Sequence, residues 1–372
     1  MRAESAPDVA FFLLDLDGGG AERAIVSLAG SVAKRGLVVD LVVGDANSDY
    51  RQEVSADVRV DDFATRSHLR VFRRLASYLR KCNPRAVMSA LDASNILLVA
   101  AAKVARYRGR TVISQRAVVD ASLEELDPTR RLATAWLQRV CFPRADALIS
   151  NSHAAASELN ARFRISPQKI TTIHNALDIG RISALAQEPL PHRARPGIPL
   201  IVSVGSLTKR KDMATLIRAF ALVRQQKEAD LAIVGKGGEE KNIKGLVSDL
   251  GLSACVRLPG FDVNPYRWIE AASVVVSAST AEGFPNVVAE ALALDRSIVA
   301  TDCPGDTAEV LQHGKWGRLV PVGDAARMAA AILAALHDRR RADGRLRAAD
   351  FAPEKVTSAY LNVLLSNPVR PS

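Results

Sequence analysis

The chain has 372 residues, 48% of them hydrophobic and 24% charged, so its composition excludes a disordered protein and suggests two domains with ample core. Its longest apolar stretches are too short to span a bilayer, and its four scattered cysteines, which form no C-x-x-C pair, indicate a reduced, cytosolic protein without a metal site. The formal net charge of +10 suits an acidic partner, such as a phosphorylated substrate, an anionic membrane surface or nucleic acid.

The first half of the chain alternates short apolar runs with amphipathic segments, the pattern of a parallel α/β domain. The first apolar run, residues 9–14, is cut off by Asp15 and predicts a buried strand rather than a signal peptide. Further strands are expected at 37–43, 58–60, 87–90, 111–114, 147–150 and 170–173, and helices at 21–34, 66–81, 94–106 and 129–142.

A glycine-rich turn joins the first expected strand to the first helix. Gly18, Gly19 and Gly20 would let backbone N–H groups approach a phosphate at the helix N-terminus. The turn has neither a Walker lysine nor the G-x-G-x-x-G spacing, so a plain tight turn is the alternative.

Positive charge is concentrated in the first half. Between Phe63 and Val119 there are twelve Lys and Arg residues and one acidic residue, Asp92. The helices expected at 66–81 and 129–142, the second of which carries Trp136, are both basic. The first has apolar residues at helical spacing: Leu69, Phe72, Leu75 and Leu79. Such a helix either packs on the sheet as an ordinary surface helix or faces anionic lipid.

Three polar residues follow expected strands at the carboxyl end, where ligands bind in open α/β sheets. Arg116 would either bind an acceptor phosphate or serve as a structural surface arginine. His153 ends the string Asn151-Ser152-His153, which is expected to cap the next helix. His174 is isolated in the sequence from any other His or Cys, which argues against metal binding.

The second half repeats the pattern after a linker at 187–199, which contains four prolines and a glycine. Strands are expected at 200–204, 231–234, 273–277 and 297–300, and helices at 213–226, 239–250, 287–294 and 353–365. Two α/β halves that each open with strand, turn and helix predict two Rossmann-like domains facing across a cleft.

Two polar turns of this half stand between a strand and a helix. The first, 205–212, reads Gly-Ser-Leu-Thr-Lys-Arg-Lys-Asp and ends in a run of cations. The second reads Glu282-Gly283-Phe284-Pro285-Asn286, and Glu290 follows about two helical turns after Glu282. Both turns place charge beside a helix N-terminus, which offers N–H groups to an anion. Solvated surface charge is the alternative interpretation of each turn.

The string Glu282-Gly-Phe-Pro-Asn-Val-Val-Ala-Glu290 resembles the E-x7-E motif of retaining glycosyltransferases of family 4, which have the GT-B fold. The similarity extends to 19–23, 174–178, 205–212 and 256–261, which resemble the family's first loop, hinge, phosphate loop and base-binding segment. The resemblance implies an acceptor-binding domain at 1–180, joined by a crossing C-terminal helix at 351–372, and a donor-binding domain at 181–350.

The resemblance also implies roles for individual residues. Lys211 falls on the lysine that grips the donor diphosphate; Ser206 replaces the arginine of the commonest pattern, and Arg210 would supply the missing charge. Glu282 would lie near the sugar, and Glu290 would bind the ribose. The other implied donor contacts are Gly283, Phe284, Pro285, Asn286, Val287, Gly205, Gly235 and Phe261, and the implied acceptor or phosphate contacts are Gly18, Gly19, Gly20 and Arg116.

The implied reaction is a metal-independent, retaining transfer of a sugar from a nucleotide-diphosphate donor, expected to be UDP-linked, to a glycan or polyprenyl-diphosphate-linked acceptor. The basic helices suggest a peripheral protein at the inner face of the cell membrane, acting in polysaccharide or lipopolysaccharide assembly.

Nucleic acid is not expected as a partner, because the chain offers no aromatic-rich basic loop or known nucleic-acid module. The alternatives are a nucleotide-sugar 2-epimerase of the same fold, which lacks the E-x7-E string, and a catalytically degenerate binding protein, suggested by Ser206.

Overall fold

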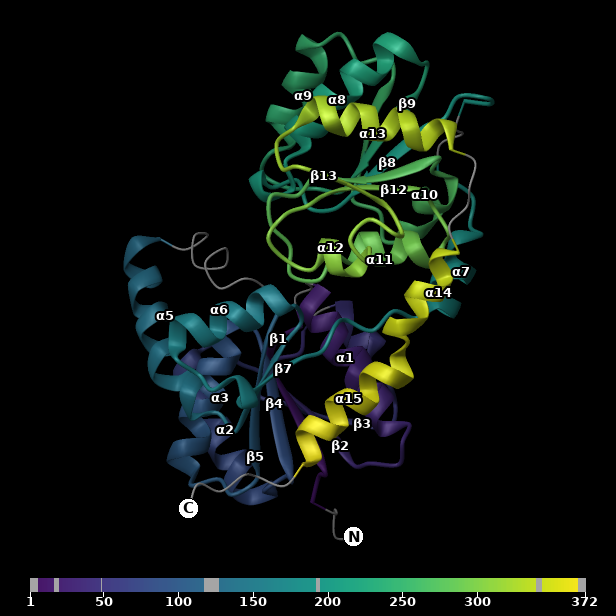
Figure 1. Ribbon diagram of the computed structural model, residues 1–372. Coiled ribbons are helices and arrows are strands. Elements are labelled where there is room, and N and C mark those ends of the chain that lie inside the picture. Colours follow the sequence, from purple (N-terminus) through teal and green to yellow (C-terminus); the bar gives the residue numbers. More distant parts are fainter. Residues whose placement is uncertain are drawn as a thin grey trace. The chain divides into compact units, whose positions relative to one another are not determined.

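The computed structural model describes residues 6–16, 20–47, 49–116, 127–191, 195–338 and 343–366. The chain forms two compact units, Met1–Ala176 with Pro353–Ser372, and Leu177–Ala352 (Figure 1). The division falls before helix α7 (Ile179–Ala186), whereas a boundary after residue 180 would cut that helix near its first turn.

The first unit is built on a parallel sheet whose described strands run in the order β3-β2-β1-β4-β5-β6-β7. The chain fills one side from β1 to β3 and then starts again at β4 beside β1, so the topological switch point lies between β1 and β4. The strands are β1 (Val9–Asp15), β2 (Val39–Asp45), β3 (Val58–Asp62), β4 (Ala86–Ala90), β5 (Arg110–Gln115), β6 (Ala147–Ser150) and β7 (Ile170–Thr172).

Helices cover both faces of this sheet, which is why β1 reads as a continuous apolar run. Val9, Phe11 and Leu13 belong to one core, with side chains of α1 and α15, and Ala10 and Phe12 belong to the opposite core, with α2 and α3. The helices are α1 (Gly20–Ala33), α2 (His68–Cys82), α3 (Asp92–Ala105), α5 (Pro128–Cys141), α6 (His153–Phe163) and α15 (Pro353–Leu365), with short 3₁₀ turns at Asp49–Glu53, Phe142–Arg144 and Pro167–Lys169.

Helix α15 belongs to the first unit although it follows the second unit in the sequence. It packs against α1 and buries Tyr360 in the same core as β1. Arg35, just after α1, reinforces this contact by donating to Ser358 Oγ at 2.9 Å and to the Glu354 carbonyl oxygen at 2.7 Å. The expected return of the C-terminal helix to the first domain is therefore confirmed.

Helix α2 packs on the sheet through a face that the sequence pattern predicts only in part. Leu75 and Leu79 are fully buried, as expected, but they share the core with Val71 rather than Leu69, which is 59% exposed. Leu69 lies two residues before Val71 and therefore points about 200° around the helix from it. The expectation that Leu69 belongs to the packed face is wrong.

The second unit has its own parallel sheet, with described strands in the order β10-β9-β8-β11-β12-β13. The chain moves outward from β8 to β10, then returns to β11 on the other side of β8, so the loops after β8 and β11 leave the sheet next to each other. The strands are β8 (Leu200–Val204), β9 (Asp230–Val234), β10 (Val256–Gly260), β11 (Val274–Ser277), β12 (Ile298–Thr301) and β13 (Arg318–Val320).

Two apolar cores lie on the two faces of this sheet. One includes side chains of α8 and α13, and the other includes Trp268, Phe284 and most of α11. The remaining elements are α7, α8 (Met213–Gln226), α9 (Glu240–Asp249), α10 (Tyr266–Ala271), α11 (Asn286–Ala293), α12 (Thr307–Val310), α13 (Ala325–His337) and α14 (Gly344–Ala348), with 3₁₀ turns at Lys209–Lys211 and Ala349–Phe351.

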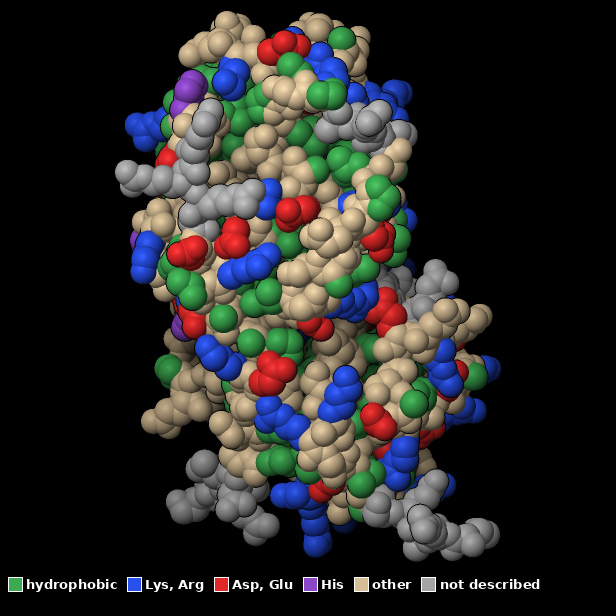
Figure 2. Space-filling view, turned by 90° about the vertical axis from the view of Figure 1, so that its right-hand side faces the viewer, with side chains coloured by type: hydrophobic (Ala, Val, Ile, Leu, Met, Phe, Trp, Pro, Cys, Tyr) green, Lys and Arg blue, Asp and Glu red, His purple; other side chains and the backbone are tan. Residues whose placement is uncertain are grey.

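No helix among the described residues is both long enough and apolar enough to cross a membrane. Charge is mixed over the face shown in Figure 2, where Lys and Arg side chains alternate with Asp and Glu.

Candidate active site

The loops after β8 and β11 meet around one carboxylate, that of Glu282, which is 7% exposed. Lys211 Nζ contacts Glu282 Oε1, and Arg210 Nη1 lies 3.3 Å from Glu282 Oε2. Ser279 Oγ donates to Oε1 at 2.6 Å, so two cations and a hydroxyl hold one buried carboxylate. This cluster occupies the switch point of the second sheet, the place where α/β folds bind ligands.

The backbone also joins the two loops, so the cluster does not depend on long side chains alone. The Thr280 N–H donates to the Arg210 carbonyl oxygen at 2.8 Å, and Arg210 Nη1 donates to the Ala281 carbonyl oxygen at 3.0 Å. Asp212 has a φ of 41° and caps α8 by accepting from the Thr215 N–H at 3.2 Å. Asp212 thus ends the cationic turn directly after Lys211 and begins α8.

Glycines allow the loops of this unit to approach each other closely. A Cβ on Gly235, which follows β9, would lie 1.8 Å from the Gly205 carbonyl oxygen. A Cβ on Gly305, which follows β12, would lie 1.9 Å from the Glu282 carbonyl oxygen. Only a residue without a side chain fits at either place, so these glycines set the positions of the phosphate-loop candidate and of Glu282.

Helix α11 begins beside this cluster at Asn286 and carries Glu290 on its second turn. Phe284 is buried against Phe351, with ring centroids 5.1 Å apart, so its side chain anchors the turn in the core. Glu290 is half-buried and Asn286 is exposed. The structure thus brings Glu282 and the start of α11 to the same edge of the sheet, as the sequence predicts.

The other predicted donor residues lie on loops at the same ends of the strands. Ser206 is exposed directly after Gly205, and Phe261 follows β10 with its ring 65% exposed. Lys236 Nζ lies 5.1 Å from the centroid of the Phe261 ring, a cation–π contact on the loop after β9. Arg210, rather than Ser206, is the residue that joins Lys211 at the Glu282 carboxylate.

Of the residues predicted to bind the acceptor, Gly18 and Gly19 lie outside the described residues, and Gly20 is the first residue of α1. Arg116 follows β5 and donates to Tyr360 Oη at 3.1 Å and to Asn175 Oδ1 at 3.2 Å. Arg116 therefore ties β5 to α15 and to the segment after β7. This geometry gives it a structural task, and its binding of a phosphate stays a prediction.

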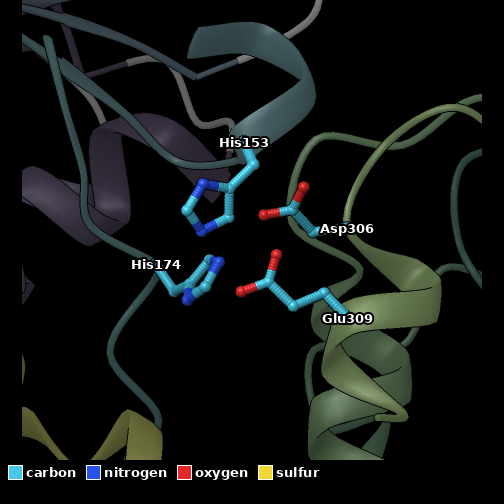
Figure 3. A group of neighbouring side chains, drawn as sticks. All are labelled: His153, His174, Asp306 and Glu309. Carbon is cyan, nitrogen blue, oxygen red and sulfur yellow. The ribbon is translucent and has the colours of Figure 1, made fainter. Parts of the chain in front are cut away.

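Two histidines of the first unit lie next to each other (Figure 3). His153 is the first residue of α6, which Ser152 caps as predicted, and its ring centroid is 5.9 Å from that of His174, which follows β7. The expectation that His174 is isolated from other histidines is wrong, because neighbouring strands β6 and β7 bring the two residues together. Imidazole pairs are transition-metal ligands, so the sequence argument against metal binding at His174 no longer holds.

Ser279 and Cys303 flank the cluster without having been assigned a role from the sequence. Ser279 is 1% exposed and is held from behind by Thr301 Oγ1, which donates to its carbonyl oxygen at 2.5 Å. Burial raises the pKa of the Cys303 thiol, so this cysteine is not a thiolate nucleophile at neutral pH. The sequence signal available for Ser279 was a hydroxyl residue shortly after an expected strand. Nothing in the sequence indicated that this hydroxyl would contact Glu282.

Ser279→Ala is expected to lower turnover about tenfold, because it removes a short hydrogen bond to a charged group and leaves the buried Glu282 less well held. Steady-state kinetics with a saturating donor would measure the loss. Ser279→Thr, which keeps the hydroxyl, should retain more activity than the alanine variant. Equal losses in both variants would show that the hydroxyl does not matter.

The two parallel-sheet α/β units have the two-domain Rossmann-like architecture of the GT-B fold, and a charged cluster lies at the switch point of the second sheet. Comparison with known proteins identifies the family. The model described as Glycosyltransferase Family 4 matches residues 18–181, and the model described as Glycosyl transferases group 1 matches residues 198–338. The chain belongs to the family 4 type of glycosyltransferases.

Individual relatives agree with this assignment. The chain is 32% identical over 239 residues to the N-acetylgalactosamine-N,N'-diacetylbacillosaminyl-diphospho-undecaprenol 4-alpha-N-acetylgalactosaminyltransferase of Campylobacter jejuni, a match that covers 63% of this chain and 64% of that protein. It is 27% identical to the lipopolysaccharide core biosynthesis glycosyltransferase LpsE of Rhizobium meliloti, over 94% of this chain and 97% of that one. The crystal structure of Anabaena HepE in complex with UDP and glucose shares the fold, with a TM-score of 0.79, 19% identity and coverage of 97% of this chain and 100% of that one.

Proposed function

We propose that the chain transfers a sugar from a UDP-sugar to a glycan or polyprenyl-diphosphate-linked acceptor, with retention of the anomeric configuration, in the assembly of cell-surface polysaccharide or lipopolysaccharide. The observation that carries the proposal is the Glu282 carboxylate, buried at the switch point and held by Lys211, Arg210 and Ser279. The second unit would bind the donor and the first unit the acceptor.

Substrate classes come from the relatives. The name of the Campylobacter jejuni relative specifies a diphospho-undecaprenol substrate, and that of the Rhizobium meliloti relative specifies lipopolysaccharide core biosynthesis. The Anabaena structure holds UDP and glucose. These relatives favour a UDP-linked donor, a lipid-linked acceptor and an activity at the inner face of the cell membrane.

Lys211 and Arg210 would stabilise the negative charge that develops on the leaving diphosphate. The bond between the anomeric carbon and the phosphate oxygen breaks, the acceptor oxygen forms the new bond on the same face of the sugar, and the acceptor proton passes to the leaving phosphate. Preorganised positive groups that stabilise the charge developing on a leaving group are usually the largest single contribution to catalysis. Glu282 keeps both cations in place and would face the sugar, and the helix N-terminus of α11 would add N–H donors to the phosphates. We propose that this chemistry needs no metal.

Glu290 would bind the ribose hydroxyl groups. Glu290→Ala is expected to weaken donor binding about 10- to 100-fold with little change in kcat, because a charged hydrogen bond contributes about 1.5–3 kcal/mol and is made equally in the ground and transition states. Titration calorimetry with UDP measures the effect. Glu240→Ala is the matched control, since Glu240 lies on the surface of α9 and pairs with Lys244. An unchanged UDP affinity in Glu290→Ala would contradict the ribose assignment.

A thermal-shift screen against UDP-, GDP- and ADP-sugars tests the donor class, because a ligand that binds only the folded state raises the melting temperature. Stabilisation by UDP-sugars alone supports the proposal, and stabilisation by GDP- or ADP-sugars alone contradicts the UDP assignment.

The 2-epimerase alternative is tested by incubation of the donor without acceptor. Such an enzyme would accumulate the 2-epimer, whereas a transferase would release UDP slowly by hydrolysis.

A further inference from the structure

Helix α5 exposes apolar side chains along one side. Leu132 is 74% exposed, Trp136 is 64% exposed and Leu137 is 36% exposed. Leu132 and Trp136 are four residues apart and therefore lie one above the other on the helix surface. Gln138 and Cys141 mark the buried side of the same helix, where it packs against α3. Packing within the first unit thus leaves a tryptophan and a leucine in contact with solvent.

Arginines border these apolar side chains. Arg130, Arg131 and Arg139 are exposed on α5, and the helix contains no acidic residue. Asp127, which caps the helix, pairs with Arg130 at 3.3 Å. Cationic groups therefore flank the apolar stripe formed by Leu132, Trp136 and Leu137 on the outer surface of α5.

The neighbouring helices extend the positive surface. Helix α3 packs against both α2 and α5, so the three helices form one layer over the sheet of the first unit (Figure 1). Helices α2 and α3 contain one acidic residue between them, Asp92. It is the first residue of α3, where a negative charge complements the helix dipole. The exposed cations of these two helices are Arg70, Arg73, Arg74, Arg80, Lys81 and Lys103.

We propose that α5 is the surface by which this protein binds an anionic lipid bilayer, with Trp136 and Leu132 inserted at the level of the headgroups and the arginines bound to lipid phosphates. This inference rests on the proposed function, because a polyprenyl-linked acceptor would be met at a membrane. Tryptophan prefers the membrane interface, and basic residues beside it add electrostatic attraction to anionic lipid. The occupant is a bilayer rather than a polyanion in solution, since exposed Leu132 and Trp136 would gain nothing from a soluble phosphate chain.

The test is co-sedimentation of the full chain with vesicles of phosphatidylcholine alone or mixed with phosphatidylglycerol. Binding is expected only to the anionic vesicles and should weaken as salt is raised, because salt screens the arginines. Leu132→Ser with Trp136→Ser should weaken binding about tenfold or more, given the apolar area withdrawn from the interface. Leu346→Ser is the matched control, since Leu346 is an apolar side chain that is 67% exposed in the second unit. The tryptophan fluorescence should shift to shorter wavelength on vesicle binding, and Trp136→Phe should abolish that shift.

Equal binding to neutral vesicles, or unchanged binding in the double variant, would overturn the proposal. Gel filtration that shows a dimer for the natural chain and a monomer for the double variant would also overturn it, because the apolar stripe would then be a subunit interface. The proposal would also be overturned if duplex DNA competed with the vesicles for the protein and the Trp136→Phe change did not alter that competition. Hydrolysis of UDP-sugar in the absence of vesicles separates this inference from the proposed function: loss of vesicle binding with intact hydrolysis refutes the surface, whereas absent hydrolysis with intact vesicle binding refutes the enzymatic proposal.

Discussion

Lys211→Ala is expected to lower kcat about 10²- to 10³-fold, because removing one preorganised group that stabilises developing charge costs an enzyme roughly that much. The Lys211 ammonium contacts the buried Glu282 carboxylate and would lie against the leaving diphosphate. The measurement is the rate of UDP release from the donor, with acceptor where one is found and by slow hydrolysis otherwise. Full activity in Lys211→Ala would contradict the assignment of the phosphate loop.

Lys209→Ala provides the matched control for this loss. Lys209 precedes Lys211 by two residues on the same short turn, but its side chain is exposed. Its removal changes the net charge of the loop by the same amount as Lys211→Ala and should leave kcat within about twofold, because screened surface charges contribute little. A similar loss in both variants would mean that overall loop charge, rather than the position of Lys211, determines turnover.

A double variant separates catalysis from stability. Lys211→Ala leaves Glu282 with one cation fewer in a buried position, which is expected to destabilise the second unit. Lys211→Met with Glu282→Gln removes both charges and should recover most of the lost melting temperature while remaining inactive. Recovery of activity along with stability would show that the lysine serves only to balance Glu282.

Gly235→Ala is expected to abolish UDP binding and to lower the melting temperature of the protein by several degrees. Its Cβ would lie 1.8 Å from the Gly205 carbonyl oxygen, a distance at which the backbone of one loop must move. Gly235 also has a φ of 150°, which L side chains rarely adopt. Movement of Gly205 would carry the phosphate loop away from Glu282, so donor affinity should fall along with stability. Titration with UDP and thermal unfolding measure the two effects.

Gly238→Ala is the control in the same loop, because a Cβ at Gly238 would meet nothing within 4 Å. It should bind UDP with unchanged affinity. Wild-type affinity in Gly235→Ala would show that the close approach of the two loops is not required for donor binding.

Much of the fold follows from the sequence because apolar runs of parallel strands alternate with periodic helices. Helix α8 (Met213–Gln226) begins and ends at the predicted residues, since Asp212 caps it and the apolar period is unbroken. The inward face of α2 was harder to predict because leucine and arginine alternate there, and only the sheet beneath determines that Val71, and not Leu69, is buried.

The positions of Glu282 and Lys211 could be predicted because each lies on a short turn with a recognisable residue pattern. Strand order brings these two turns together. Ser279 and Gly305 were not predicted as partners of Glu282, because their contacts depend on the path of loops after β11 and β12. His174 was misjudged for the same reason: its neighbour His153 is adjacent through sheet order, not through sequence spacing.

Time-resolved proton NMR of UDP-sugar hydrolysis tests whether the enzyme transfers the sugar with retention and depends on Lys211 to do so. UDP should be released, and the free sugar should first appear with the donor's own anomeric configuration. Both signals should be lost in Lys211→Ala but kept in Lys209→Ala. Release of the opposite anomer, accumulation of a 2-epimer, or unchanged hydrolysis in Lys211→Ala would contradict this mechanism.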